Sequence, residues 1–256
     1  MVSYRARPYL EACLRSLEAA GGLAEITVVD NASQDGTAEA ARMFSAATVI
    51  ENRENLGFAA AANQGAEATR ATYVLLLNSD VEPTRSAIEA LCAELEANPR
   101  TAAACARLVT ADGREQLPFR ANKPIAVKWA PGACLLLRRS ACDEVGWFDP
   151  RFFFYNEDID LGIRLRRAGW RLRYVPAATV LHHEGKSTDA VRHETIVHGY
   201  RGGLYLIEKH YRWALGAARA AVRAEIRLRG AWYRRLRHPT EKQRAYLAAL
   251  PALRSL

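Results

Sequence analysis

The chain has 256 residues, of which 50% are hydrophobic, so it is long enough for one large domain or for one domain with an appendage. Its longest apolar runs, residues 73–77 and 133–137, are far shorter than the ~20 residues that cross a bilayer, and no secretory signal is visible at the start. Five scattered cysteines without a CxxC pair argue against a disulfide scaffold and indicate reduced thiols in a cytosolic protein.

The positive charge is concentrated at the C-terminus. The whole chain carries a formal net charge of +8. Residues 212–256 contain eleven Lys and Arg against two Glu, a net charge of +9, so residues 1–211 are close to neutral. We therefore predict a main domain over residues 1–211 and a basic helical extension over residues 212–256.

Strand and helix patterns alternate through the first half of the chain. In order, the patterns predict a helix at residues 8–20, a strand at 26–29, a helix at 37–44, a strand at 48–50, a helix at 58–69 and a strand at 73–77. Nearly unbroken apolar strands of this kind are typical of burial on both faces of a sheet. The alternation predicts an α/β fold with a doubly wound, mostly parallel sheet, whose ligands lie beyond the carboxyl ends of the strands.

The second half is less regular. The expected elements are a helix at residues 83–97, a strand at 102–109, a polar excursion at 110–127, a strand at 134–137, a short helix at 140–145, strands near 171–175 and 179–182, and helices at 195–213 and 215–236. The tail from residue 238 carries no clear pattern.

Residues 146–170, GWFDPRFFFYNEDIDLGIRLRRAGW, combine an aromatic run with three acids, Glu157, Asp158 and Asp160. Carboxylates at a helix start beside apolar side chains are partly shielded from water, and such a carboxylate can act as a general base. Ordinary structural roles explain the same residues, because Asn156 is a favourable N-cap and acids suit the first turn of a helix.

Polar residues also stand at the predicted strand ends, namely Asp30, Asp80 and His182. Each one alone fits turn chemistry or a satisfied strand-end histidine. Together with Asp158 they make four polar residues on the ligand side of one sheet, which indicates a functional site.

Six motifs follow one another between residues 28 and 188. They are VVDNASQDGT (28–37), NLGFAAAANQG (55–65), LLLNSDV (75–81), GACLLLRR (132–139), the 146–170 stretch, and VPAATVLHHEGKST (175–188). In this order they resemble the family 2 glycosyltransferases of the GT-A fold, and most closely the bacterial rhamnosyltransferase-like members.

The resemblance implies a nucleotide-sugar site. Asp30 would read the edge of a pyrimidine base, and the glycine at Gly57 would allow close backbone approach at a helix start that suits an anionic ligand. The residues implied in donor binding are Ser3, Tyr4, Asp30, Asn55, Gly57, Asn63, Asp80 and Gly132.

The resemblance also implies a metal-assisted reaction. Asp80 and His182 would hold Mg²⁺ or Mn²⁺, which would stabilise the departing nucleoside diphosphate. Asp158 would act as the general base, with Glu157 beside it shaping the acceptor pocket. Asn78 stands where many relatives have an acid, so we expect weaker metal affinity than a two-acid motif provides.

The first strand is expected to be short, because Met1-Val2-Ser3-Tyr4 stands where relatives have a full central strand. A strand of about three residues would weaken the sheet. We expect either a start further upstream or a divergent base pocket.

The basic extension has the pattern of an amphipathic helix. Arg219, Arg223 and Arg227 repeat every four residues, and Trp232 adds aromatic surface. This pattern fits a solvated helix packed on the main domain, and it fits an interfacial helix over residues 215–237 on anionic lipid. No recognised nucleic-acid motif accompanies the charge, so we expect no nucleic-acid partner.

The resemblance predicts an inverting glycosyltransferase that uses dTDP-rhamnose or a UDP-sugar and a glycan or lipid-linked acceptor. We expect a cytoplasmic enzyme, peripheral at the inner face of the bacterial membrane. Two alternatives remain open at this point. A sugar nucleotidyltransferase would show a Gly-rich phosphate loop near the first strand, and residues 2–8 contain no glycine. A non-enzymatic basic adaptor for membrane or nucleic acid would use its acids only structurally.

Overall fold

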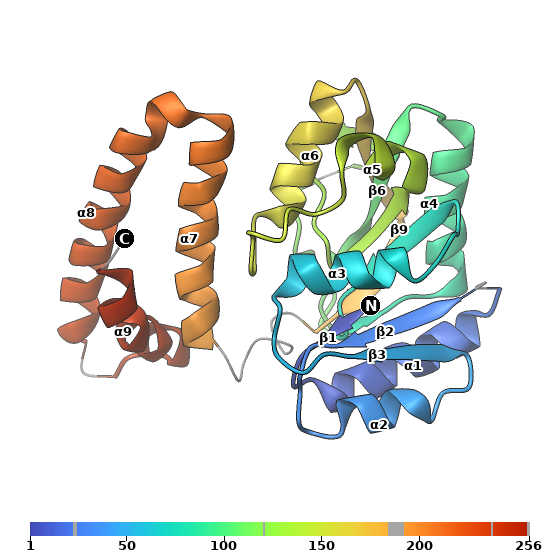
Figure 1. The fold of residues 1–256 in the computed structure, drawn as a ribbon, viewed down its shortest axis with the longest axis horizontal. Coiled ribbons are helices and arrows are strands. Elements are labelled where there is room, and N and C mark those ends of the chain that lie inside the picture. Colours follow the sequence, from blue (N-terminus) through green and yellow to red (C-terminus); the bar gives the residue numbers. More distant parts are fainter. Residues whose placement is uncertain (23–24, 120, 184–191, 237, 255–256) are drawn as a thin grey trace.

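Figure 1 shows the computed structural model, which describes residues 1–22, 25–119, 121–183, 192–236 and 238–254. The strands are β1 (Val2–Ser3), β2 (Ile26–Asp30), β3 (Ala47–Glu51), β4 (Tyr73–Leu77), β5 (Val81–Glu82), β6 (Thr101–Val109), β7 (Ile125–Val127), β8 (Cys134–Arg138) and β9 (Arg171–His182). The helices are α1 (Arg7–Ala20), α2 (Thr37–Arg42), α3 (Phe58–Glu67), α4 (Arg85–Ala97), α5 (Arg139–Val145), α6 (Glu157–Arg167), α7 (Arg192–His210), α8 (Leu215–Arg234) and α9 (Glu241–Leu253). The end of the last motif, residues 184–188, and residue 237 of the predicted interfacial segment lie outside the described residues.

Two sheets make up the α/β half. In the first, β1, β2 and β3 are parallel and adjacent in this order. The second has the order β4-β8-β6-β9-β5, with β7 beside β9. A single parallel bridge between Val2 and Asn78 links the two sheets, so the two-residue β1 lies at their junction. The expected short first strand is therefore present.

The predicted parallel pairing is found for β1 to β3 and for β6 with β9. In contrast, β8 runs antiparallel to both β4 and β6, and β5 runs antiparallel to β9. Helical crossovers connect the strands of the first sheet and permit parallel pairing, whereas β6 and its antiparallel neighbour β8 have only β7 and loops between them among the described residues.

Helices cover both faces of the sheets, which explains the nearly continuous apolar strands. On one face α1, α2 and α4 pack against alternate strand residues such as Leu136 and Ala104. On the other face α3, α5 and α6 pack against their neighbours Leu135 and Cys105. The five cysteines are all described and free, and four of them are buried, as predicted.

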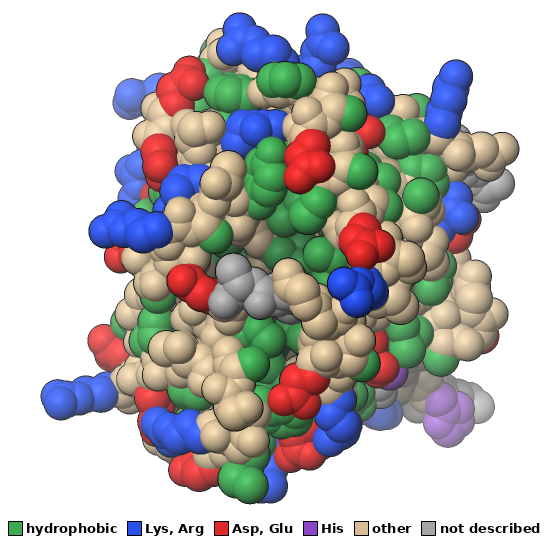
Figure 2. Space-filling model, turned by 90° about the vertical axis from the view of Figure 1, so that its right-hand side faces the viewer, with side chains coloured by type: hydrophobic (Ala, Val, Ile, Leu, Met, Phe, Trp, Pro, Cys, Tyr) green, Lys and Arg blue, Asp and Glu red, His purple; other side chains and the backbone are tan. Residues whose placement is uncertain are grey.

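A cavity of about 230 Å³ lies between the two sheets, because the two residues of β1 bridge only part of the length of β2 and β4. Its apolar lining includes Leu17, Val29, Leu75 and Ile88. Hydrophobic side chains gather in a hollow on the face shown in Figure 2, while charges of both signs are spread around it.

Helices α7, α8 and α9 lie together beside the α/β half (Figure 1). Their shared apolar core consists of Val197, Ile226, Tyr246, Ala249, Leu250 and Leu253. Helix α9, which the sequence pattern did not predict, begins at a capping box formed by Thr240 and Gln243. Within the described part of the chain, no helix is both long and apolar enough to span a membrane.

Helix α7 contacts both parts of the chain. Asp160 of α6 is completely buried and bonds to Lys209 at 2.8 Å and to His210 at 2.7 Å, both on α7. Arg164 stands four residues after Asp160, a spacing that is typical of a surface pair on a helix, but its contact with Asp160 at 2.8 Å belongs to this buried network. The division of the chain at residue 211 stays a prediction. Helix α7, which precedes this residue, is anchored to α6 of the α/β half and also shares an apolar core with α8 and α9, which follow it.

We expect Asp160→Asn to lower the free energy of unfolding by about 2 kcal/mol, because a charged hydrogen-bond acceptor is lost from a buried network. Burial alone would raise the pKa of Asp160, but hydrogen bonds from Lys209 and His210 and the charge of Arg164 lower it. A lowered pKa stabilises the fold above the unfolded value of 3.8 and loses this contribution as the pH falls, so the difference should shrink in acid.

Urea denaturation at neutral and progressively lower pH measures this difference. The control is Glu89→Gln, which removes an acid from an exposed pair with Arg85 and should change stability by less than about 0.5 kcal/mol. Equal stability of the Asp160 variant and the wild type at neutral pH would contradict the anchoring role.

Candidate active site

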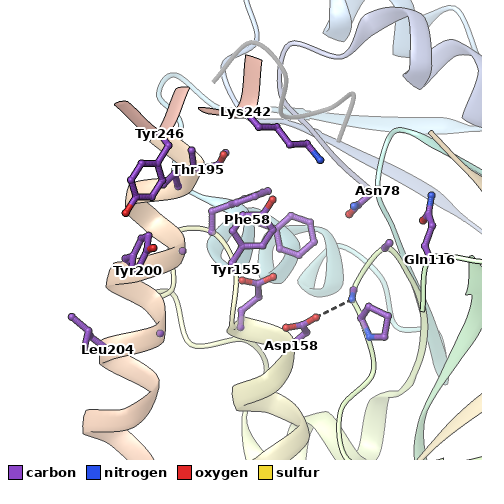
Figure 3. A pocket seen from close by; sticks show the side chains of 18 of the residues that line it. Phe58, Asn78, Gln116, Tyr155, Asp158, Thr195, Tyr200, Leu204, Lys242 and Tyr246 are labelled. Atoms are coloured by element: carbon purple, nitrogen blue, oxygen red, sulfur yellow. Dashed lines mark hydrogen bonds between the residues drawn. The ribbon is translucent and has the colours of Figure 1, made fainter. Parts of the chain in front are cut away.

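A cavity of about 1080 Å³ lies between the α/β half and the three C-terminal helices. Figure 3 shows the side chains that surround it. The α/β half contributes Phe58, Asn78, Gln116, Gly132, Glu157, Asp158 and His182, and the helices contribute Thr195, Tyr200, Leu204, Glu225, Arg229, Lys242 and Tyr246. Four site residues predicted from the sequence, Gly132, Glu157, Asp158 and His182, therefore line one cavity.

Asp158 lies in the first turn of α6 with its carboxylate at the cavity wall (Figure 3). Its Oδ1 accepts the backbone N–H of Ile159 at 2.8 Å, and its Oδ2 accepts the backbone N–H of Gly132 at 3.3 Å. A carboxylate has about four lone-pair positions, so two donors orient the group and leave room for a substrate hydroxyl.

The turn before α6 has an uncommon backbone conformation. Tyr155 and Asn156 are both left-handed, with φ of 68° and 73°. The expected cap bond is absent, because the Asn156 side chain donates to the carbonyl of Gly199 on α7 at 3.3 Å. At Gly202 of the same helix, a Cβ would lie 2.9 Å from the Tyr155 carbonyl oxygen. Two consecutive residues of this kind store strain, which is typical of functional sites, and α7 packs closely against them.

The two acids at the start of α6 differ in their surroundings. Burial raises the pKa of Asp158 above its ordinary value. Burial also raises the pKa of Glu157, and the neighbouring Asp158 charge raises it further. Among the described residues, Glu157 Oε2 has no hydrogen-bond partner, whereas Asp158 has two. The pair therefore favours an ionised Asp158 beside a protonated Glu157.

Asp80 and His182 lie next to each other, as the sequence predicted. Strands β5 and β9 pair Val81 with His182, which brings His182 Nε2 to 3.5 Å from Asp80 Oδ1. The other ring nitrogen, Nδ1, lies 2.5 Å from Oε1 of Gln116, whose amide also donates to the His182 carbonyl at 2.9 Å. An Nδ1–H donated to Gln116 leaves the Nε2 lone pair directed at Asp80.

This pair fits a divalent cation by its chemistry. Asp80 is only 1% exposed, and a buried carboxylate beside an oriented imidazole is a mixed oxygen and nitrogen donor set. No group of three or more His, Cys, Asp or Glu side chains within the described ranges is arranged to hold a metal. Asp80 and His182 would thus supply two ligands, and phosphate oxygens and water would supply the rest, as Mg²⁺ prefers.

A narrow cavity of about 70 Å³ adjoins the large one and holds several of the predicted donor residues. Tyr4, Asn55 and Gly57 line it. The positive φ of Gly57 and a Cβ distance of only 2.6 Å to the Phe153 carbonyl oxygen exclude a larger residue there. The ring of Phe153 stacks on His198 of α7 with centroids 4.1 Å apart.

The other predicted donor residues do not line this cavity; besides Asp80 and Gly132, described above, they are Asp30, Ser3 and Asn63. Asp30 lines a separate cleft of about 650 Å³ at the carboxyl ends of β2 and β3, and it accepts from Ser33. Ser3 is buried beside it, at the end of β1. Asn63 is turned toward the protein interior, because its amide bonds to both the backbone N–H and the carbonyl of Phe148. The structure does not bring Asn63 to the nucleotide side, and its observed role is to join α3 to the aromatic stretch.

Sequence reasoning missed three contributions. Gln116 lies in the polar excursion that no motif marks. Asn31 connects the donor loops through hydrogen bonds to Asn55 at 2.8 Å and to the Gly57 carbonyl at 3.2 Å. Helix α7 supplies Thr195 and His198 from about forty residues beyond Asp158. Of these residues, only Asn31 could have been found from the sequence, because it lies inside the motif at residues 28–37.

The sequence matches a known family over most of its length. The pattern that defines "Glycosyl transferase family 2" covers residues 1–161. The chain is 31% identical to the N-acetylglucosaminyl-diphospho-decaprenol L-rhamnosyltransferase of Mycobacterium tuberculosis, over 89% of each chain.

Two solved structures share the fold. The mannosyltransferase PcManGT from Pyrobaculum calidifontis, in complex with GDP-Man and Mn²⁺, superposes with a TM-score of 0.61 at 19% identity and covers 99% of this chain and 85% of its own. GalNAc-T7 with UDP, GalNAc and Mn²⁺ superposes with a TM-score of 0.56 at 15% identity, over 72% of this chain and 41% of its own.

The sheets, their helical layers and these likenesses define an enzyme of the glycosyltransferase class with the GT-A fold. The chain belongs to glycosyltransferase family 2 and is rhamnosyltransferase-like within it. The predicted fold class and family are thereby confirmed, in preference to the nucleotidyltransferase and adaptor alternatives.

Proposed function

We propose that the protein is an inverting glycosyltransferase that moves rhamnose from a nucleoside-diphosphate donor, dTDP-rhamnose or another nucleotide sugar, to a hydroxyl of a glycan or lipid-linked acceptor. The observation that carries the proposal is the shared cavity, which Asp158 of α6 and His182 of β9 both line, with Asp80 3.5 Å from the His182 ring. The likeness to an enzyme named for a decaprenol-linked substrate supports the acceptor class.

The residues suggest how the reaction proceeds. The acceptor hydroxyl would donate its proton to Asp158, which the N–H groups of Gly132 and Ile159 hold in place. Its oxygen would then attack the anomeric carbon from the face opposite the diphosphate, so a single displacement inverts that centre. A divalent cation held by Asp80 and His182 would stabilise the charge of the leaving diphosphate. Phe58 and Tyr155 border the cavity and would limit access of water.

The test is release of nucleoside diphosphate from dTDP-rhamnose, UDP-sugars and GDP-sugars, each with and without a lipid-linked N-acetylglucosaminyl diphosphate. Acceptor-dependent release from one donor, with an inverted anomeric linkage in the product, is the expected result. Absence of release from every donor, or a retained configuration, would overturn the proposal.

We also propose that residues 212–256 place the enzyme on the inner face of an anionic membrane. The exposed apolar side chains support this arrangement, with Trp213 88%, Leu228 73% and Trp232 59% exposed. Leu228 and Trp232 lie one turn apart on α8, next to the arginine stripe that includes Arg227. Exposed apolar and cationic stripes side by side are typical of interfacial helices.

The double variant Leu228→Ser, Trp232→Ser is expected to reduce co-flotation with anionic vesicles at least about tenfold. Each side chain would contribute on the order of 1 kcal/mol at the interface, and 1.4 kcal/mol corresponds to a factor of ten. Met43→Ser is the control, because Met43 is 84% exposed on the α/β half and should not affect flotation. Unchanged flotation of the double variant would rule out this face as the anchor.

A further inference from the structure

Lys242 of α9 projects into the large cavity from the side opposite Asp158. Figure 3 shows its ammonium group directed across the cavity toward Asn78. The residue lies in the first turn of α9, whose start is held by the reciprocal bonds of Thr240 and Gln243. The capping box thus fixes the start of the helix from which Lys242 extends.

The cationic groups that line this cavity differ in their partners. Arg229 is engaged, because it pairs with Glu225 at 2.6 Å and stacks over the ring of Tyr246 at 5.5 Å. Lys242 forms no ion pair with any residue in the described ranges. An ammonium group without a carboxylate partner, facing a polar cavity wall, is suited to bind an anion.

The wall that Lys242 faces joins the two halves of the site. Asn78 lines both the large cavity and the narrow donor cavity, as do Phe58 and Thr195. His182, next to Asp80, lines the large cavity on the same side. A donor whose nucleoside lies along residues that line the narrow cavity, such as Tyr4 and Asn55, and whose sugar reaches Asp158 would have its diphosphate between these points.

The side chain at position 78 affects how a diphosphate would be held at this wall. Asn78 is uncharged, so Asp80 is the sole acid of the Asn78-Ser79-Asp80 motif. A second carboxylate there would attract a metal more strongly and would compete with phosphate for Lys242. With an amide at this position, a bound diphosphate would have fewer metal-binding acids beside it and the Lys242 ammonium across the cavity.

We propose that Lys242 binds the diphosphate of the nucleotide-sugar donor, so that the C-terminal helical extension completes the donor site. The proposal rests on the proposed glycosyltransferase function and adds a binding residue that lies far beyond the family motifs. Lysine binds phosphate as a compact point charge with three N–H donors.

The test is calorimetric binding of dTDP, UDP and GDP in chelator and in Mn²⁺, followed by the corresponding monophosphate and nucleoside of the tightest ligand. Lys242→Gln is expected to weaken diphosphate binding about tenfold or more in chelator, which is the scale of one charged hydrogen bond. Nucleoside binding should be unchanged, and Lys242→Arg should restore most of the diphosphate affinity.

The matched control is Arg244→Gln on the same helix. Both side chains are exposed, but only Lys242 is among the residues that line the cavity, so the loss of the Arg244 charge should change affinity by less than about twofold. If the wild type binds a diphosphate and Lys242→Gln binds it equally well, the role of Lys242 is overturned while the proposed function stands. An effect confined to the acceptor KM would assign Lys242 to an acceptor phosphate and overturn the donor assignment. A wild-type protein that binds none of the diphosphates would overturn both the proposed function and this inference.

Discussion

Replacing Asp158 by Asn is expected to lower the rate of sugar transfer by about 10²–10⁴-fold while donor binding is retained. The carboxamide has nearly the same shape, and its oxygen can still accept the N–H of Gly132 or of Ile159. It cannot accept the proton of the attacking hydroxyl. The loss should therefore appear in kcat, with the affinity for the nucleoside diphosphate close to that of the wild type.

The neighbouring acid provides the control. Because burial and the Asp158 charge both raise the pKa of Glu157, we expect it to be protonated when Asp158 is ionised. Glutamine resembles a protonated glutamate, so Glu157→Gln should retain transfer within about tenfold of the wild type, far above the Asp158→Asn variant. Equal losses in both variants, or full transfer by Asp158→Asn, would refute the assignment of the base.

The pH profile offers a second measurement on the same variants. Burial raises the pKa of Asp158, and a general base works only when it is ionised. Transfer should therefore rise with pH through an apparent pKa above the ordinary value of 3.8, and it should fall as the solution becomes more acidic. In Asp158→Asn, the low residual rate of transfer should no longer rise with pH in this range.

Asp80→Asn is expected to abolish the contribution of a divalent metal to donor binding. In the wild type, Mn²⁺ should strengthen binding of the nucleoside diphosphate at least about tenfold, since Asp80 and His182 would hold the cation and its charge would offset that of the diphosphate. The variant keeps the size of the side chain at a position that is 1% exposed but loses its charge. Its affinity with Mn²⁺ should equal its affinity in chelator.

Two further variants separate the metal from the fold. Gln116→Leu leaves both proposed ligands in place but removes the group that orients His182, so it should weaken the Mn²⁺ effect about tenfold. Glu82→Gln alters an acid that pairs with His183 at 2.7 Å, and it should leave the effect intact. A metal effect that survives in Asp80→Asn would show that the cation is held elsewhere.

Much of the fold was predictable because it depends on local patterns. The apolar runs at residues 26–29, 73–77 and 134–137 became β2, β4 and β8, since a strand buried on both faces must be apolar along its length. Asp80 and His182 were selected at strand ends, and the pairing of β5 with β9 brings them together. The position of Asp158 at a helix start and at the cavity wall also agrees with the prediction.

Other features depend on contacts between distant segments. Asp160 had the spacing of a surface pair, yet α7 covers it with Lys209 and His210. Asn63 had a motif position that implied ligand contact, yet its amide bonds to the backbone of Phe148, 85 residues later. Neither outcome could be derived from spacing, because each depends on which element packs against the residue.

The sequence alone determined the layered α/β arrangement, because hydrophobic periodicity acts over a few neighbouring residues. Its ordered motifs indicated the family, and they marked Asp80 and Asp158 as candidate acids of the site. Tertiary structure decided which of these acids share a space. It placed α7 against the left-handed turn at Tyr155 and Asn156, set Gln116 behind His182 and directed Lys242 across the cavity. These arrangements arise from packing between segments far apart in the chain, and no local pattern of residues encodes them.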